Sequence, residues 1–531
     1  MPLTGQFSYD AVPYTSLPYH HSHPDNICTI GRLFGMNPAF PTECRVLEIG
    51  CASGGNLLPM AEQLRESEFS GIDLSKRQVE EGRENIRALG LGNLVLDYGD
   101  ICDEQFVRGS YDYIICHGVY SWVSREVQDR ILSVCRDHLS PHGIAYVSFN
   151  TYPGWHLRES ARQMMRYHSA RYDTPRKRVA ASRELLDFLV SQLRGSEDPY
   201  ALMLRRELGI LRDRSDDYLF HEHLERYNAP CYFHQFAAEI ERFSLQYLGD
   251  AELSSMLGFG MSDETLNTIN RITTDIIQME QYLDFVRNRQ FRMALICHDT
   301  VPLKRKLDSE SALKLRFLLK PSATCSPADI ASDAEHCFET GSDRIIRTGI
   351  PLMKAGIGCL MEKWPCSVTL DELYRQVKKK MDAAGVSLLP ETETKNDLVA
   401  ALLQITGPGG VSLRSWEPPV TDQAGERPRI RPSSIVTVRR YSFATNAHHE
   451  LIQLAPAVIQ LALLLDGKKN RTELIKEMIG LADKGIISIT MDGVPLDDPQ
   501  VREDAVTQMV DNTLENFAGS LLLVPEESGG C

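Results

Sequence analysis

The 531-residue chain lacks any run of about 18 uninterrupted apolar residues, and its first residues show no basic flank followed by an apolar stretch. These absences argue against a transmembrane helix and a signal peptide, so no membrane insertion and a cytoplasmic location are expected. The thirteen cysteines are odd in number and include no CxxC pair, which argues against a disulfide framework and a zinc ribbon. Reduced thiols are therefore expected.

Positive charge is scarce as well. The chain has 57 Lys and Arg against 72 Asp and Glu, a formal net charge of −15. A field of this sign repels nucleic acid, so a nucleic-acid partner is not expected. The composition is otherwise that of a globular protein, 43% hydrophobic and 24% charged. A chain of this length exceeds what one hydrophobic core can organise, and about three or four domains are expected.

Between residues 40 and 150, apolar segments typical of strands alternate with segments of helical character. Strands this apolar, each followed by a helix, predict a mostly parallel sheet covered on both faces, a doubly wound α/β domain. A helical insertion is expected at about 155–215. The stretch after it reads as strand, helix, strand, and its return to the sheet edge would close the domain near residue 256.

The rest of the chain divides by composition. Pro, Gly and polar residues concentrate in one stretch, the best linker candidate. The accessory regions beside it are mixed and mainly helical, apart from the β-like SIVTVRRYSF at 434–443. The expected organisation is a capping segment (1–39), the α/β domain (40–256), a middle accessory domain (257–405), a linker (406–431) and a C-terminal accessory domain (432–531).

The segment VLEIGCASGGN, residues 46–56, places a glycine loop between an apolar strand and a helix. There the backbone can approach a ligand and helix N-terminal amides point at it. A tight strand-to-helix turn would look the same. However, Asp73 ends the next strand, where a carboxylate can bind a ribose diol, and Asp100 ends the third, where it can accept from an adenine amino group. The three together favour a nucleoside ligand.

The spacing Glu48-x-Gly50-x-Ala52-x-Gly54 resembles the first motif of class I methyltransferases that use S-adenosyl-L-methionine (AdoMet), E/D-x-G-x-G-x-G. Ala52 replaces the middle glycine. AdoMet lacks the pyrophosphate that a dinucleotide would press against this loop, so the departure also disfavours an NAD enzyme. The resemblance implies AdoMet as cofactor, bound by Glu48, Gly50, Cys51, Ala52, Gly54, Asn56, Asp73, Leu74, Asp100, Ile101 and His117.

Longer segments, among them DYIICHGVYSWV and HEHLERYNAPCYFHQF, resemble the bacterial methyltransferases that carry a methyltransferase regulatory domain. That group includes rickettsial protein lysine methyltransferases that act on outer-membrane proteins. The resemblance implies a class I methyltransferase fold and a protein lysine as methyl acceptor. Two alternatives stay open, a small-molecule methyltransferase and an AdoMet-binding regulatory protein without turnover, because the motifs argue for binding only.

Aromatic and polar side chains follow the fourth and fifth predicted strands. Ligands of open parallel sheets bind beyond the carboxyl ends of the strands, so these residues are expected to line the acceptor channel. Rings there would attract a sulfonium or an alkylammonium, and an apolar slot would help a lysine lose its proton. The alternative is that the rings only pack a loop. The expected channel residues are His117, Tyr120, Trp122, Asn150, Tyr152 and Trp155, with His117 or Tyr120 passing the proton to water.

Two histidine-rich stretches are weak metal candidates. Adjacent histidines in YHHSHPD (19–25) point in different directions, and the histidines of HEHLE (221–225) are two apart, whereas a zinc helix needs them four apart. No metal is expected. Arg158, Arg162 and Arg166 form one helical stripe, read either as a solvated face or as a contact with an acidic partner or substrate. The helical insertion is the expected interface of any homodimer.

Overall fold

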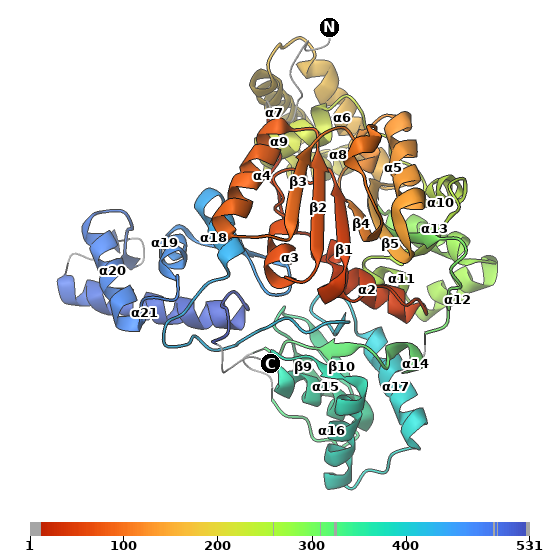
Figure 1. The fold of residues 1–531 in the computed structure, drawn as a ribbon, viewed down its shortest axis with the longest axis vertical. Helices are drawn as coiled ribbons and strands as arrows, with labels where there is room; N and C mark the ends of the chain where they lie inside the picture. Colours follow the sequence, from red (N-terminus) through yellow and green to blue (C-terminus); the bar gives the residue numbers. More distant parts are fainter. Residues whose placement is uncertain are drawn as a thin grey trace.

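The computed structural model describes residues 12–258, 260–307, 309–322, 326–491, 494–495 and 498–526. Its centre is a seven-stranded sheet in the order β3-β2-β1-β4-β5-β7-β6 (Figure 1). All neighbouring pairs from β3 to β5 are parallel, and β7 runs antiparallel to β5 and to β6. The strands are β1 Arg45–Ile49, β2 Glu68–Asp73, β3 Leu94–Tyr98, β4 Tyr111–Cys116, β5 Leu139–Asn150, β6 Leu245–Asp250 and β7 Phe291–His298. This order and its helices confirm the predicted doubly wound, class I methyltransferase fold.

The α/β domain extends further than predicted. Strand β7 lies between β5 and β6, with Ala145 opposite Ile296 and Leu245 opposite His298. The end expected at residue 256 is therefore too early, because the sheet is complete only at His298. The helices of this domain are α2 Pro24–Leu33, α3 Leu57–Gln63, α4 Lys76–Leu89, α5 Arg125–His138, α10 Phe233–Glu241, α11 Leu253–Met256, α12 Asp263–Ile272 and α13 Ile276–Arg287.

The helical insertion forms a small core of its own beyond the carboxyl ends of the strands. Met165, Leu186, Leu204 and Leu208 meet at its centre and are buried. Its last turn is π-helical, with hydrogen bonds that close over one residue more than in an α-helix. The elements are α6 Trp155–Ser169, α7 Pro175–Gln192, α8 Pro199–Arg212, α9 Asp216–Leu219 and the π-helical turn η5 Phe220–Leu224.

The middle domain buries a separate core around Phe317, Leu360 and Leu373. Its cysteines correct one expectation, since Cys366 is disulfide-bonded while ten other described cysteines are free thiols. An odd total without a CxxC pair does not exclude a single bridge. The elements are α14 Ser309–Ala312, β8 Arg316–Leu318, β9 His336–Glu339, β10 Ile345–Thr348, α15 Pro351–Lys363, β11 Val368–Thr369, α16 Leu370–Ala383, α17 Glu391–Gln404 and β12 Ser412–Arg414.

The segment expected to be a linker is anchored at its start. The Ser415 and Trp416 amides donate to the Asp25 carboxylate at 2.7 and 2.9 Å, and Arg414 pairs with the same carboxylate at 3.0 Å. Between 421 and 427 most residues are exposed. The freely accessible part of this connection is therefore much shorter than the predicted 406–431.

The C-terminal domain packs beside the α/β domain, where α18 contacts α3 and α4 (Figure 1). The β-like stretch 434–443 is largely helical, which corrects the prediction: Pro432 occupies the first helical turn, and Val438 packs in the domain core. Within the described residues, no helix is long and apolar enough to cross a membrane. The elements are α18 Pro432–Arg440, β13 Phe443–Thr445, β14 Leu451–Gln453, α19 Pro456–Leu464, α20 Arg471–Asp483, β15 Thr490–Met491, β16 Val494–Pro495 and α21 Pro499–Gly519.

Candidate functional site

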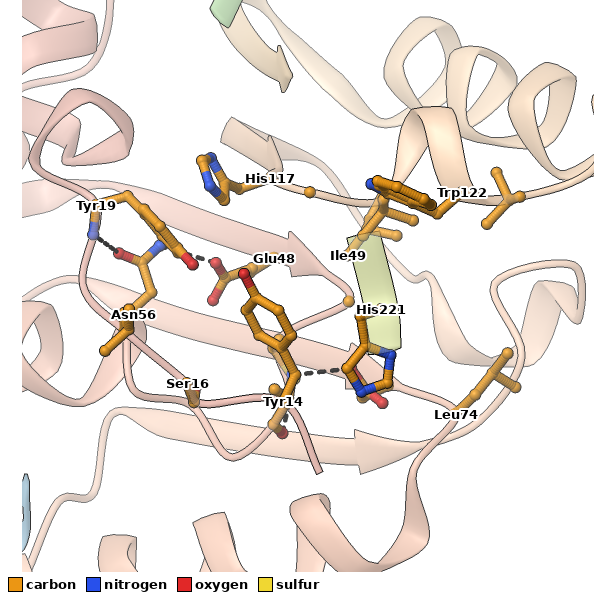
Figure 2. A pocket seen from close by; sticks show the side chains of 18 of the residues that line it. Tyr14, Ser16, Tyr19, Glu48, Ile49, Asn56, Leu74, His117, Trp122 and His221 are labelled. Atoms are coloured by element: carbon orange, nitrogen blue, oxygen red, sulfur yellow. Dashed lines mark hydrogen bonds between the residues drawn. The ribbon is translucent and has the colours of Figure 1, made fainter. Parts of the chain in front are cut away.

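A cavity of about 530 Å³ opens at the carboxyl ends of β1 to β4 (Figure 2). The strand order reverses between β1 and β4, and open α/β sheets bind their ligands at such a switch point. Three segments far apart in the sequence close the cavity, namely the glycine loop after β1, the N-terminal segment and the helical insertion. Of the residues predicted to bind AdoMet, those that line it are Glu48, Gly50, Cys51, Ala52, Asn56, Asp73, Leu74, Asp100, Ile101 and His117.

The glycine loop depends on backbone angles that side chains disfavour. Gly50 and Gly54 both have φ 76°, and a Cβ on Gly50 would lie 2.4 Å from Val119 Cγ2. Gly54 does not line the cavity; it shapes the turn, and a Cβ there would lie 3.1 Å from Leu96 Cδ1. Ala52 has φ 49°, so the residue in place of the middle glycine keeps a left-handed conformation.

Two carboxylates from neighbouring strand ends border the loop. Asp73 accepts from the Ala52 amide at 2.8 Å through one oxygen and from the Ser75 amide at 2.7 Å through the other. Asp73 therefore orients the glycine loop, besides lining the cavity where a ribose diol was expected. Asp100, at the end of β3, accepts from the Cys102 amide at 2.9 Å and lines the cavity next to Ile101.

Glu48 is a buried carboxylate in the cavity wall. Asn56 Nδ2 donates to its Oε1 at 2.8 Å, whereas Oε2 has no hydrogen-bond partner among the described residues. Burial raises the pKa of Glu48 to about 8; the Asn56 bond lowers it and the nearby Asp73 carboxylate adds to the rise. A cationic ligand would favour the ionised form. The unsatisfied oxygen thus fits the positively charged methionine portion of AdoMet.

The N-terminal segment crosses the cavity as a cap. Ser16 Oγ accepts from the Gly55 amide at 2.8 Å, the Tyr19 amide donates to Asn56 Oδ1 at 2.9 Å, and Gln78 Nε2 donates to the Tyr14 carbonyl at 2.9 Å. The rings of Tyr14 and Tyr19 line the cavity (Figure 2). Of the expected capping segment 1–39, the part that lines the cavity is 14–17 and Tyr19, and residues 1–11 lie outside the described chain.

Four of the six predicted channel residues line the cavity. His117 stacks on Tyr19 with ring centroids 3.6 Å apart, and burial lowers its pKa to about 3, so the imidazole is neutral. Trp122 and Trp155 meet edge to face at 6.2 Å. Asn150 lines the same side, and its Nδ2 donates to Asn228 Oδ1 at 3.1 Å.

Tyr120 and Tyr152 do not line the cavity, which corrects their predicted placement. Tyr120 lies in the 3₁₀ turn η4 (Tyr120–Trp122) and contacts the Phe236 ring edge to face at 5.5 Å. Side chains three apart eclipse in a 3₁₀ turn, so Val119 and Trp122 share the cavity side and Tyr120 turns into the core. Tyr152 is half-buried and stacks on His156 at 3.9 Å, outside the cavity.

The helical insertion brings residues that the sequence reading missed. Arg158, Tyr218, His221 and Glu222 line the cavity. Burial raises the pKa of Glu222 to about 7, against the opposing charges of Arg158, His221 and Arg162. The only signals were HEHLE, weighed as a metal motif, and the arginine stripe. Within the described chain no group of His, Cys, Asp and Glu is arranged to hold a metal ion.

The arginine stripe is partly buried. Arg158 pairs with Glu207 at 3.3 Å and donates to the Tyr218 hydroxyl at 3.3 Å. Arg162 is 1% exposed, with its guanidinium 5.8 Å from the centre of the Trp122 ring. The reading of a solvated face is therefore wrong for these two. The described lining holds four carboxyl groups (Glu48, Asp73, Asp100 and Glu222) and one guanidinium, and a cationic ligand would favour ionisation of the two with a raised pKa, Glu48 and Glu222.

Three family models match successive parts of the chain. They are described as a methyltransferase domain (residues 46–143), a predicted methyltransferase regulatory domain (215–298) and the PKMT C-terminal winged helix domain (426–522). The second match ends at the last residue of β7, in agreement with the sheet. The third begins within the expected linker.

Relatives match nearly the whole chain. The uncharacterized protein RP789 of Rickettsia prowazekii is 33% identical over 527 residues, which cover 97% of this chain and 93% of that protein. The structure of PKMT2 from Rickettsia typhi in complex with AdoHcy is 30% identical with a TM-score of 0.83, covering 97% of this chain and 100% of the other. With these matches and a site that fits AdoMet, the chain belongs to the class I AdoMet-dependent methyltransferases that carry a methyltransferase regulatory domain, the family of the rickettsial PKMT proteins.

Proposed function

We propose that this AdoMet-dependent methyltransferase transfers its methyl group to lysine side chains of a surface or outer-membrane protein. The observation that carries the proposal is the cavity lining, which combines the rings of Trp122, Trp155 and Tyr218 with the Glu222 carboxyl group; we call this part of the lining the acceptor side. Aromatic rings and a carboxylate suit an alkylammonium. They suit an anionic or a purely apolar acceptor less well.

A lysine must lose a proton before it can react. Its reference pKa is about 10.4, and apolar surroundings lower it by disfavouring the charged form. Glu222, with a pKa of about 7, is the carboxylate of the insertion placed to take this proton. His117 is a weak base at its lowered pKa, and Tyr120 lies outside the cavity. Glu222 therefore replaces both in our proposal.

The residues of the cavity then act by position. When bound, AdoMet would supply a methyl group that is activated by the positively charged sulfonium to which it is attached. Glu222 would accept the ammonium proton and so leave a neutral amine as nucleophile for the methyl group that AdoMet would supply. Trp122 and Trp155 hold the alkyl chain in line, an alignment that supplies much of the rate.

Similarity supports a protein acceptor. The C-terminal domain matches a model named for PKMT, and a PKMT2 structure is similar to 97% of this chain. The net charge of −15 disfavours a nucleic acid in the same role. The surface target and the cytoplasmic location rest on the family resemblance and the sequence, and they stay predictions.

Mass spectrometry after incubation with AdoMet tests the acceptor. The full chain is mixed with either an outer-membrane protein extract or a metabolite extract, and AdoHcy formation is followed in parallel. We expect methylated lysines in the protein extract. Methylation confined to metabolites would contradict the proposal in favour of a small-molecule enzyme. AdoHcy binding without turnover on either extract would point to a non-catalytic regulatory protein.

We further propose that two copies pair through the helical insertion. Large apolar side chains are exposed along its helices, with Tyr167 88%, Phe188 56% and Leu202 49% exposed. Apolar side chains that gather on one surface commonly mark an interface, and the pairing that we propose would bury these three. Light scattering should show a dimer that Phe188→Glu with Leu202→Glu converts to a monomer. Leu389→Glu, at an exposed leucine of the middle domain, is the matched control and should leave the dimer intact.

A further inference from the structure

The turn between β13 and β14 of the C-terminal domain reaches the cofactor cavity of the α/β domain. His449 in this turn is 1% exposed, and its Nε2 lies 2.9 Å from Asn56 Oδ1, although the two residues are 393 positions apart. Asn56 lines the cavity. A side chain of the winged-helix domain is thus one hydrogen bond away from the candidate AdoMet site.

Asn56 connects three parts of that site. Its Nδ2 donates to Glu48 Oε1 at 2.8 Å and to Ser22 Oγ at 3.0 Å, and its Oδ1 accepts from the Tyr19 amide at 2.9 Å. The Tyr19 amide can only donate, which fixes the orientation of the Asn56 amide with Oδ1 toward His449. His449 must therefore donate from Nε2. This single bond fastens a group that holds both Glu48 and the capping segment.

The backbone of His449 is held in an unfavourable conformation. Its φ is 61°, in the left-handed region, which glycine adopts without steric cost. Asn446 enforces the turn, since its Oδ1 accepts from the His448 and Glu450 amides, both at 2.9 Å. A turn that only joined two strands would not need an imidazole here. Strain maintained by surrounding bonds is typical of functional positions.

We propose that His449 is a positioning residue for AdoMet. From the C-terminal domain it holds Asn56, and through Asn56 it keeps Glu48 and the capping segment at Tyr19 in the conformation that binds the cofactor. The winged-helix domain therefore completes the cofactor site, in addition to any role toward the acceptor.

Calorimetric titration of the full chain with AdoHcy tests this positioning role without an acceptor. His449→Gly suits the backbone angle and removes the donor, so we expect the Kd to rise about two- to tenfold, the usual worth of one neutral hydrogen bond. His449→Gln keeps a donor at similar reach and should restore the Kd to within about twofold of the parent. His448→Ala, which removes the neighbouring half-buried ring, is the matched control and should bind like the parent.

A parental Kd for His449→Gly, or a His449→Gln variant as weak as His449→Gly, would overturn the proposal. Hydrogen–deuterium exchange of the unmodified protein covers the case in which variants do not fold. Coupling between sites is reciprocal, so AdoHcy should slow exchange in the peptide that spans 446–450. No change there would equally overturn it. Because AdoHcy binding requires no acceptor, these results are independent of whether the acceptor is a lysine.

Discussion

At the scale of single residues, our proposal makes Glu222 the group that decides whether an amine acceptor can react. The neutral His117 and the core residue Tyr120 leave Glu222 as the carboxylate that the helical insertion places in the acceptor side. Its chemistry depends on ionisation, because only the charged carboxylate accepts a proton. The pKa of about 7 places this change in the neutral range.

Glu222→Gln should lower kcat by roughly 100-fold or more, the usual contribution of a general base, while the Kd for AdoHcy stays parental. The parental rate should rise with pH up to about 7 and then level off, since the ionised form is the active one; the variant should lack this rise. Initial rates across the neutral range measure both. Glu225→Gln, at a carboxylate outside the cavity lining, serves as control. Full activity and an unchanged pH profile in Glu222→Gln would exclude it as the base.

Glu48 shows a conflict between stability and binding. Its pKa is about 8 in the folded protein and 4.5 without burial, so folding favours the protonated form. The stability contributed by this proton is complete below about 4.5 and is lost as pH rises to about 8, with a slope of at most about 1.4 kcal/mol per pH unit. Binding of a cationic ligand instead needs the ionised form.

Glu48→Gln should therefore be more stable than the parent and bind AdoHcy more weakly near pH 8, whereas near pH 4.5, where the parent carboxyl is protonated, the two should be similar in stability and in affinity. Urea unfolding at the two pH values and calorimetry measure these effects. Gln can still accept from Asn56 Nδ2, so the hydrogen bond at 2.8 Å is retained. A variant with parental stability at high pH would show that Glu48 is ionised in the unliganded protein.

The sequence predicted the cavity residues that lie at strand ends. It did not predict those that come from segments distant in the chain. Gly50, Asp73 and Asp100 were found because consecutive parallel strands bring their carboxyl ends together. Tyr14 and Glu222 come from the cap and the insertion, whose positions depend on tertiary packing. His449 arrives from another domain, and neither its spacing nor its neighbours indicate a contact with Asn56.

At the scale of elements, the turn η4 separates two aromatic residues that the sequence grouped together. Tyr120 and Trp122 are two apart, which in a helix of three residues per turn places them on different sides. Tyr120 joins Phe149 and Phe236 in the core, whereas Trp122 faces the cavity. The number of residues per turn, which the sequence alone does not indicate, thus determines which ring lines the cavity.

Tyr120→Ala should lower the free energy of unfolding by about 3 kcal/mol through the cavity it leaves in the core. Trp122→Ala should instead lower kcat by about 100-fold, the effect of displacing a reacting group by about 1 Å, with little change in AdoHcy affinity. Chemical unfolding and steady-state kinetics of the two variants separate the effects. A stable but inactive Tyr120→Ala would place that ring in the channel after all.

Strand β7 explains why the predicted domain boundary at residue 256 comes too early. It contains Arg292, fully buried, which interrupts the apolar pattern of a central strand. Asp284 and Glu280 of the preceding helix α13 pair with its guanidinium at 2.8 and 2.9 Å. A buried charge is tolerated only with such partners. Because the tertiary structure brings these partners together, the sequence alone does not indicate that Arg292 can lie in a buried strand. The neighbouring strand β5 contains no Asp, Glu, Lys or Arg, and it was predicted.

At the scale of the whole molecule, the C-terminal domain is both a separate core and a part of the cofactor site. Its core around Val510 and Leu474 is independent of the sheet. Polar contacts join it to the α/β domain: the Ser433 amide donates to Glu62 at 2.5 Å, and Arg440 pairs with Glu81. Composition predicted the separate domain, because a hydrophobic core is visible in the sequence as a pattern of apolar residues. Composition could not predict the polar contacts between the two domains, because such contacts leave no comparable pattern in the sequence.

Limited proteolysis with a glutamate-specific protease should cut first at Glu426, in the exposed stretch 421–427. The two pieces should co-elute in gel filtration, because the Ser433, Arg440 and His449 contacts survive the cut. The nicked protein should then bind AdoHcy with the parental Kd. If urea is raised until the C-terminal piece separates while the sheet stays folded, the affinity of the N-terminal piece should fall, because Asn56 loses its donor from His449. An N-terminal piece that elutes alone and still binds AdoHcy like the intact chain would show that the winged-helix domain contributes nothing to the cofactor site.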